Sequence, residues 1–307
     1  YDMETGDKKV LYRYGIRNYE VETDLNYPII AWQPDGSELS FLYERKDVIS
    51  LMKIDFENEQ TITDKLSPEY QRVYDMDYWS ADTLMFSAST DGLSDLYMYA
   101  PITRQTTRVT DDFYDDLDAS VITLDDKRYI LFSSNRADEN LRKMDLDSIL
   151  PIGQFDLFLL DFTPPKSSLR RITFSDDASE RKARISGADE LICLADYAGH
   201  WQRIIVKQLM EDPPLAILHT KYDRDILLHE FVPASPVVID WLQKWNMPYI
   251  HTSQLDSSKT ITIRPSPSIG VLDETPEVTP HQNVKKEEVD PRYLFQTPFP
   301  VIQPATS

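Results

Sequence analysis

A single cysteine among 307 residues excludes an internal disulfide. Cys193 stands in the apolar run "ELICLA", so we expect a buried, unreactive thiol rather than a nucleophile. No stretch reaches the ~18 apolar residues that a membrane-spanning helix needs. Basic residues are also scarce, 32 against 52 acids, which gives a net charge of −20. Such a surface repels nucleic-acid phosphates and anionic lipid headgroups, and it suits cations or a basic protein partner.

Glycine is scarce too, and the eight glycines form none of the motifs that carry common chemistries. There is no Gly-x-Ser-x-Gly nucleophile elbow and no phosphate-cradling loop. His229-Glu230 lacks the second histidine, four residues after the first, that a zinc-peptidase helix requires. The four other histidines are scattered and have no cysteine at ligand spacing. We therefore expect no catalytic centre and no cofactor in this segment.

The beginning of the chain also lacks the features of a native N-terminus. It starts Tyr1-Asp2-Met3, with no initiator methionine at the first position, no basic leader region and no apolar leader region. We expect the native N-terminus to be missing, and any export signal would have been lost with it. The lack of a signal peptide therefore carries no information about location.

An internal repeat with a period near 45 residues organises the first two thirds of the chain. Phe41, Phe86 and Phe132 follow one another at 45 and 46 residues, each in an apolar run. The next equivalent is Cys193, 61 residues further on, after the 18-residue insertion "ADENLRKMDLDSILPIGQ" at 137–154. "DLYMY" at 95–99 recurs as "DLFLL" at 156–160, and "TRVT" at 107–110 recurs as "RRIT" at 170–173, with "QTIT" at 60–63 as a weaker copy. This period is typical of four-stranded propeller blades.

Each unit divides into short strands separated by turns. Residues 27–32 are apolar and lead to a turn at 34–36, where proline fixes φ and glycine allows a positive φ. Residues 39–43 read as a strand that is covered on both faces by neighbouring blades. Residues 95–99 form an aromatic-rich strand, and the Thr, Arg and Val of 106–110 form an edge-like strand. The sequence therefore predicts an all-β fold.

Three stretches carry a resemblance to a known repeat: "AWQPDGSELSFLYER", "LMFSASTDGLSDLYMY" and "YILFSSNR" followed by "FDLFLLDF" and "RRITF". They are similar to the repeat of the TolB-like, WD40-like (PD40) β-propellers, which reads approximately as Trp-Ser-Pro-Asp-Gly, an apolar strand ending in Ser-Asn/Asp-Arg, Asp-Ile-Tyr and Arg-x-Leu-Thr. Gln33 stands where serine is usual, the second unit lacks the proline and glycine of the turn, and the third keeps only Asp125-Asp126. The resemblance covers about residues 1–206.

This resemblance implies a TolB-like β-propeller of four-stranded blades that is incomplete in this chain. Over residues 1–206 we expect a partial blade, which begins with the strand-like residues 1–11, then three full units and a second partial blade. The resemblance also implies a non-catalytic interaction module of a larger Gram-negative-type envelope protein. The implied setting is the periplasm or the outer membrane, and the implied partners are outer-membrane proteins.

The periodicity fades after Val206. Residues 207–255 are expected to form an additional mixed segment. A short helix is expected near 236–246, because four apolar residues there share one helical face: Val238, Trp241, Leu242 and Trp245. Residues 256–307 hold eight prolines and no sustained pattern, which predicts an extended Pro-rich tail.

Two appended segments carry the candidate partner-binding residues. Leu141, Met144 and Leu146 in the insertion are spaced for a short helix, and a loop of this length on a repeat often contacts another molecule. The tail carries three aromatic residues near its end, and aromatics along an extended chain are typical anchors for a segment that orders on a partner. These residues are Tyr293, Phe295 and Phe299.

Five aspartates follow the unit-closing Thr110 and are the candidate metal ligands: Asp111, Asp112, Asp115, Asp116 and Asp118. A calcium ion takes at least six oxygens, and the spacing here lacks the glycine and the glutamate of an EF-hand loop. At a connection between two blades, solvated acids are the favoured interpretation. We therefore expect no tightly bound ion, with a metal site as the alternative.

Two functions from different classes remain open at this point. The first is the non-catalytic scaffold of an envelope assembly. The second is the gating or specificity propeller of a prolyl-oligopeptidase-type serine peptidase, whose propeller repeats look alike and whose catalytic part would lie outside this sequence. A nucleophile elbow in the full-length polypeptide would favour the second, and a signal peptide with a barrel or a lipid anchor would favour the first.

Overall fold

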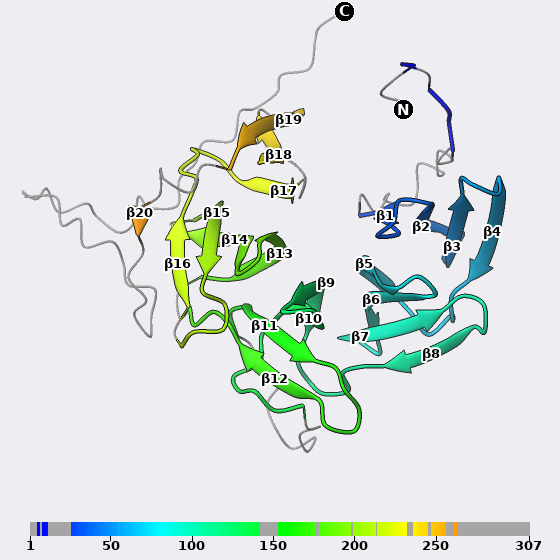
Figure 1. Ribbon diagram of the computed structural model, residues 1–307, viewed down its shortest axis with the longest axis horizontal. Helices are drawn as coiled ribbons and strands as arrows, with labels where there is room; N and C mark the ends of the chain where they lie inside the picture. The colour runs from blue at the N-terminus through cyan, green and yellow to red at the C-terminus, as the bar shows by residue number, and fades with distance from the viewer. Residues whose placement is uncertain are drawn as a thin grey trace, which may run out of the picture. The chain divides into compact units, whose positions relative to one another are not determined.

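The computed structural model describes residues 5–6, 8–11, 26–141, 153–175, 178–197, 199–212, 214–231, 236–244, 247–255 and 261–262. All of these belong to one compact unit, residues 1–270, and a second unit, residues 271–307, lies outside the described part. Every regular element in these ranges is a β-strand, and the strands form five antiparallel sheets (Figure 1). The all-β prediction is confirmed.

Four consecutive strands build each of the first three sheets. The first sheet holds β1 (Ile29–Trp32), β2 (Glu38–Arg45), β3 (Val48–Asp55) and β4 (Gln60–Lys65). The second holds β5 (Arg72–Ser80), β6 (Thr83–Thr90), β7 (Leu93–Ala100) and β8 (Gln105–Arg108). The third holds β9 (Asp116–Leu124), β10 (Lys127–Ser134), β11 (Asp156–Asp161) and β12 (Ser168–Arg171).

The last two sheets depart from this pattern of four. The fourth holds β13 (Glu180–Gly187), β14 (Glu190–Tyr197), β15 (His200–Lys207) and β16 (Leu215–Leu218), and adds β20 (Ile261–Thr262) beside β16. The fifth holds three strands, β17 (Ile226–Phe231), β18 (Val237–Lys244) and β19 (Met247–Gln254). The first strands of consecutive sheets contact one another in turn, so the sheets fan out from them as the blades of a β-propeller (Figure 1).

The second strand of a blade is apolar on both faces because it lies between two neighbouring blades. In β6, Leu84 and Phe86 pack toward the first blade, whereas Met85 packs toward the third. In β10, Phe132 packs toward the second blade and Leu131 toward the fourth. These strands therefore read as continuous apolar runs, as the sequence predicts.

The three phenylalanines of the repeat occupy equivalent positions in their hairpins. Each pairs with a residue of the third strand: Phe41 with Met52, Phe86 with Tyr97 and Phe132 with Phe158. The ring of Phe86 stacks on Tyr97 with centroids 5.8 Å apart, and that of Phe132 stacks on Phe158 at 6.0 Å. The predicted period of 45 residues is confirmed at these positions.

Aspartate and lysine replace glycine in several tight turns. The β2–β3 turn places Lys46 and Asp47 at φ 53° and 59°, and the β9–β10 turn places Asp125 and Asp126 at 48° and 62°. Two successive residues with positive φ form the hairpin turn whose twist matches that of the flanking strands. This use of the left-handed region explains how an all-β chain is built with eight glycines.

Polar side chains on the inner strands link one blade to the next. The backbone N–H of Val121 on β9 donates to the carboxylate of Asp77 on β5 at 2.8 Å. The backbone N–H of Lys182 on β13 donates to Asp118 on β9 at 3.2 Å. Nε2 of His229 on β17 donates to the carbonyl of Lys182 at 2.6 Å. These hydrogen bonds join the second blade to the third, the third to the fourth and the fourth to the fifth, and they supplement the apolar packing between the blades.

Asp75 on β5 makes the stability of the propeller depend on pH. Its carboxyl accepts a hydrogen bond from the backbone N–H of Ser87, and burial, together with the charge of Asp118, raises the pKa of Asp75 to about 7. The ordinary pKa of an aspartate is 3.8, so between that pH and about pH 7 the folded state keeps a proton on Asp75 that the unfolded chain has lost. The free energy of unfolding therefore falls as the pH rises from about 4 to about 7. Asp75→Asn is expected to remove this contribution.

The measurement is urea denaturation of both proteins at a series of pH values. Relative to Asp75→Asn, the free energy of unfolding of the wild type should fall by up to about 1.4 kcal/mol per pH unit between about pH 4 and pH 7. Asp35→Asn, which changes an exposed carboxyl, serves as the control and should follow the wild type. Parallel curves for the wild type and Asp75→Asn would contradict the assigned shift.

The helix predicted near 236–246 is wrong, because this segment is β18, the central strand of the fifth sheet. Val238, Asp240 and Leu242 are buried toward the fourth blade, while Ile239 and Trp241 point the other way. This alternation has the period of two of a strand. Residues 237–239 are β-branched, and pairing with both β17 and β19 decides the conformation.

The repeat continues beyond Val206, which lies inside β15. The predicted mixed segment at 207–255 is therefore wrong, because it holds β16 and the fifth sheet. The sequence predicts a partial blade that begins with residues 1–11. Residues 5–6 and 8–11 are the described part of this segment, and they form no strand. Of the predicted Pro-rich tail, the structure describes residues 261–262, which form β20. The insertion at 137–154 joins β10 to β11.

Candidate functional site

The five candidate aspartates do not converge on one point. Asp111 is exposed and forms an ion pair with Arg108 at 2.9 Å. Asp115 accepts a hydrogen bond from the backbone N–H of Ser94 at 3.2 Å. Asp118 is buried and pairs with Arg181 on the neighbouring blade. These three residues therefore serve separate contacts.

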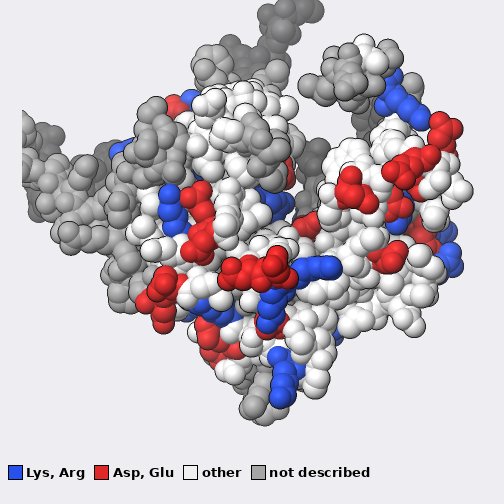
Figure 2. Space-filling model, in the orientation of Figure 1, with Lys and Arg blue, Asp and Glu red and all other residues white. Residues whose placement is uncertain are grey.

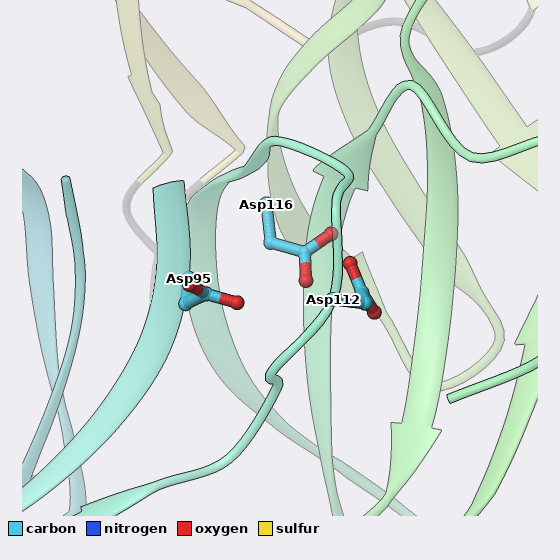
Figure 3. Close-up of side chains that lie close together, drawn as sticks. All are labelled: Asp95, Asp112 and Asp116. Carbon is cyan, nitrogen blue, oxygen red and sulfur yellow. The ribbon is translucent and has the colours of Figure 1, made fainter. Parts of the chain in front are cut away.

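The remaining two aspartates meet a third that the sequence analysis missed. Asp112 and Asp116 lie beside Asp95 of β7, and one carboxylate oxygen of each residue lies within 4.8 Å of the other two (Figure 3). All three residues are buried between the second and third blades. Asp95 opens the "DLYMY" anchor, so the register of the repeat could have placed it here.

Two arginines compensate the charge of this cluster. Arg136 is fully buried, holds both carboxylate oxygens of Asp116 at 2.7 Å, and lies 3.1 Å from Asp112. Arg108 pairs with Asp95 at 2.5 Å. Three carboxylates and two guanidinium groups leave a formal charge of −1. Burial raises the pKa of Asp116 to about 6 even though Arg136 lowers it, and burial also raises the pKa of Asp95.

The oxygens left over do not fit a calcium ion. Within this cluster, Asp95 Oδ1 has no hydrogen bond in the structure, and Asp112 Oδ2 lies 3.1 Å from Nη2 of Arg136. Calcium takes at least six oxygens, and a guanidinium group beside the ligands opposes a further cation. The arrangement is that of a buried ion-pair network between two blades.

The same contacts recur in the next blade, which supports a structural role. Asp156 pairs with Arg171 at 2.5 Å, as Asp95 does with Arg108. In both blades a threonine hydroxyl accepts a hydrogen bond from the backbone N–H that follows the aspartate. The contacts are Leu96 N–H to Thr110 at 3.0 Å and Leu157 N–H to Thr173 at 2.8 Å.

Calcium titration is expected to show no saturable site at this cluster. Isothermal titration of the wild type and of Asp112→Asn should give the same heats, because the available oxygens are too few and the guanidinium group of Arg136 already lies against Asp112 and Asp116. Asp111→Asn, which changes an exposed acid outside the cluster, is the matched control. A stoichiometric binding event in the wild type that Asp112→Asn abolishes would restore the metal-site interpretation.

The outward face of the fifth sheet carries an apolar hollow. On β18, Ile239 and Trp241 are 36% and 40% exposed, and Ile250 on β19 is 74% exposed. With Leu228 of β17 they line a hollow of about 550 Å³ that Glu230 and Tyr249 complete. The opposite face of this sheet packs on the fourth blade through Val238 and Leu242.

Among the described strands, none covers the outer edge of this sheet. In each of the first four blades the third strand pairs with a fourth, but in the described part of the chain β19 has no partner on its outer side. An eight-residue edge strand next to an apolar face is a ready template for another strand or for a protein surface. We call the face and the edge together the β17–β19 surface.

A second hollow, of about 470 Å³, lies at one end of the first three blades. Its polar groups are already engaged. Asp77 accepts hydrogen bonds from two backbone N–H groups, those of Tyr78 at 2.7 Å and Val121 at 2.8 Å. Arg128 donates to the carbonyl of Trp79 at 2.6 Å and lies over its ring. This hollow is therefore the weaker candidate.

Of the six predicted partner-binding residues, the structure describes one, Leu141. Leu141 is half-buried and packs on the apolar cluster between the second and third blades. Met144 and Leu146 lie outside the described residues, as do the three aromatic residues of the tail, Tyr293, Phe295 and Phe299. The β17–β19 surface was missed, because Trp241 and its neighbours were interpreted as one face of a helix.

The predicted burial of Cys193 is confirmed, because the residue lies between the third and fourth blades, and burial raises the pKa of its thiol. Buried His229 is held neutral, since burial lowers its pKa to about 3.

Among the described residues, no helix is long and apolar enough to cross a membrane.

Comparison with known proteins identifies the fold. No family model and no curated protein matches this sequence. TolB from Acinetobacter baumannii aligns over 74% of this chain and 51% of its own, with 16% identity and a TM-score of 0.52. A putative TolB from Agrobacterium tumefaciens aligns over 76% of this chain and 79% of its own, with 13% identity and a TM-score of 0.52.

Prolyl oligopeptidase B from Galerina marginata has a similar propeller. It aligns over 78% of this chain and 34% of its own, with 11% identity and a TM-score of 0.50. This chain spans about half the length of the Acinetobacter TolB structure and a third of the oligopeptidase. At these identities the likeness shows the fold alone. The chain has a TolB-like β-propeller fold.

Proposed function

We propose that this chain is a non-catalytic β-propeller scaffold that binds protein partners through the β17–β19 surface. The observation that carries the proposal is the apolar hollow of that surface, formed by Leu228, Ile239, Trp241 and Ile250 beside a strand edge that no other described strand pairs with. Contiguous exposed apolar area of this kind marks protein interaction sites. The tail and the insertion, with their candidate anchors, are further contact segments of the same scaffold.

The charge of the chain agrees with a protein partner. The net charge of −20 disfavours nucleic acid, and Figure 2 shows basic side chains scattered among acids on the viewed face rather than gathered into one tract. By its likeness to TolB structures, we assign the scaffold to a periplasmic or outer-membrane-associated assembly with outer-membrane proteins as partners. The buried charge networks hold the blades together and take no part in binding.

The alternative function is the gating propeller of a prolyl-oligopeptidase-type peptidase. The structural likeness to prolyl oligopeptidase B supports it. In that case the β17–β19 surface would contact a hydrolase domain of the same polypeptide. A full-length sequence with a nucleophile elbow would decide for this alternative, and a full-length sequence without one would decide against it.

Site-specific photo-crosslinking tests the proposed function. A photoreactive phenylalanine analogue at Ile250, in the full chain expressed in cells, should yield an adduct of higher mass after irradiation. The same analogue at Ile102, an isoleucine that is 78% exposed on a turn of the second blade, is the matched control and should yield none. Trp241→Glu in the Ile250 background should abolish the adduct. Absence of an adduct at Ile250, or equal labelling at Ile102, would contradict the proposal.

A further inference from the structure

β20 is an extra strand in the sheet where it lies. The fourth blade already has its four strands, and β20 extends the outer edge beside β16 through two residue pairs, Ile217 with Thr262 and Leu218 with Ile261 (Figure 1). For comparison, β3 and β4 pair over six residues. The fifth sheet, which directly precedes β20 in the chain, has no fourth strand among the described residues.

The sequence around β20 matches the fourth strand of the first blade. The β2–β3 hairpin pairs Arg45 with Val48, and the β18–β19 hairpin pairs Lys244 with Met247 in the same way. The third strands end at Asp55 and Gln254. Each end is followed five residues later by a similar tetrapeptide, "QTIT" at 60–63 and "KTIT" at 259–262. A constant displacement of 199 residues, seen between Asp55 and Gln254 and between Thr63 and Thr262, therefore relates β3 and β4 of the first blade to β19 and the segment that ends in β20.

The register of a fourth strand on β19 follows from this match. In the first blade, Lys53 pairs with Ile62 and Asp55 with Gln60. The same displacement would pair Thr252 with Ile261. The connection would be as short as the β3–β4 turn, so closing it costs little chain entropy. This match gives β20 a register on the outer edge of β19, in addition to the one that it has on β16.

We propose that β20 exchanges between two edges: in one arrangement it lies beside β16, and in the other it pairs with β19 as the fourth strand of the fifth blade. The second arrangement occupies the edge that a partner would use, so β20 acts as an intramolecular competitor at the β17–β19 surface. This regulatory role rests on the proposed function, whereas the exchange itself is a property of the chain. A ligand that prefers the open edge shifts the equilibrium toward the arrangement beside β16.

Two disulfide variants of the full chain test the exchange. Thr252→Cys/Ile261→Cys reports pairing with β19, and Leu218→Cys/Ile261→Cys reports pairing with β16. Under mild oxidation both should form an intramolecular disulfide, which peptide mapping after proteolysis identifies at monomer mass. Ile261→Cys alone is the control for reaction with buried Cys193. If the Thr252/Ile261 pair fails to form while the Leu218/Ile261 pair does, or if only intermolecular dimers appear, the exchange is wrong.

The regulatory consequence is measured separately from the exchange. The oxidised Thr252→Cys/Ile261→Cys variant should lose the photo-crosslinked adduct at position 250 by at least about tenfold relative to the same protein after reduction. An adduct that is equally strong before and after reduction would overturn the competition, even where the disulfide forms. If no protein yields an adduct but the disulfide forms, the proposed function fails and the exchange stands.

Discussion

Replacing Arg136 with methionine is expected to lower the free energy of unfolding by about 3–5 kcal/mol. The guanidinium group is fully buried and contacts both Asp112 and Asp116, so its removal leaves these two carboxylates between the blades without their shared counter-charge. The side chain also lies over the rings of Tyr114, Phe132 and Phe158 at 5.1 to 5.7 Å, and methionine keeps much of that apolar contact. The loss therefore measures chiefly the ion-pair network.

Urea denaturation of the full chain measures this effect, and two variants control it. Arg104→Met removes an arginine that is 73% exposed from its pair with Asp64, and it should cost less than about 1 kcal/mol. Arg136→Met/Asp112→Asn/Asp116→Asn removes Arg136 together with both of its partners and should recover part of the loss, because Asp95 keeps its pair with Arg108 and no buried charge is left unpaired. A cost for Arg136→Met as small as that for Arg104→Met would show that the network does not hold these blades together.

The sequence predicts the repeat because each blade must satisfy the same packing conditions. A second strand between two blades needs apolar side chains on both faces, and this condition places Phe86 and Phe132 in continuous apolar runs at a fixed period. Local composition alone also predicts the turns and the inert Cys193. These features depend on contacts that recur from blade to blade, so a single sequence contains several independent copies of the signal.

The candidate site could be predicted less well, because it depends on which residues from different blades meet. Five neighbouring aspartates looked like one cluster, but the strand pairing sends Asp111, Asp115 and Asp118 to separate contacts and brings in Asp95 from 17 residues before Asp112. The spacing of the aspartates in the sequence also does not show that Asp112 and Asp116 are buried beside Arg136. The repeat register does contain the missing information, since Asp95 and Asp156 hold equivalent positions and pair with equivalent arginines.

The β17–β19 surface is exposed because the fifth sheet is the last blade in the described part of the chain. Ile239 and Trp241 occupy positions that would face a neighbouring blade, and their exposure follows from the absence of such a blade on that side in the described part of the chain. Helical spacing of the apolar residues in 236–246 concealed the strand, because residues four apart, such as Val238 and Leu242, share one face both in a helix and in a strand. The match between "QTIT" and "KTIT" is the signal that extends the repeat past Val206.

Replacing Phe86 with alanine is expected to lower the free energy of unfolding by about 3–5 kcal/mol. The side chain is 1% exposed, and its ring meets Tyr70 edge to face at 5.4 Å and stacks on Tyr97 at 5.8 Å. The surrounding strands are fixed by ladder pairing on both sides of β6, so the cavity left by the ring cannot collapse freely. Both the lost burial and the remaining cavity therefore contribute to the cost.

Two further alanine variants make this prediction a test of the repeat. Phe132→Ala removes the equivalent ring from the next blade and should cost about as much as Phe86→Ala, since Phe132 is 0% exposed and stacks on Phe158 in the same register. Phe56→Ala removes a ring that is 40% exposed and stacked on Trp32, and it should cost about 1 kcal/mol or less. Equivalent positions in a repeated core should lose similar stability on the same truncation. If the denaturation midpoint of Phe86→Ala is close to that of Phe56→Ala and far from that of Phe132→Ala, the blades are not equivalent.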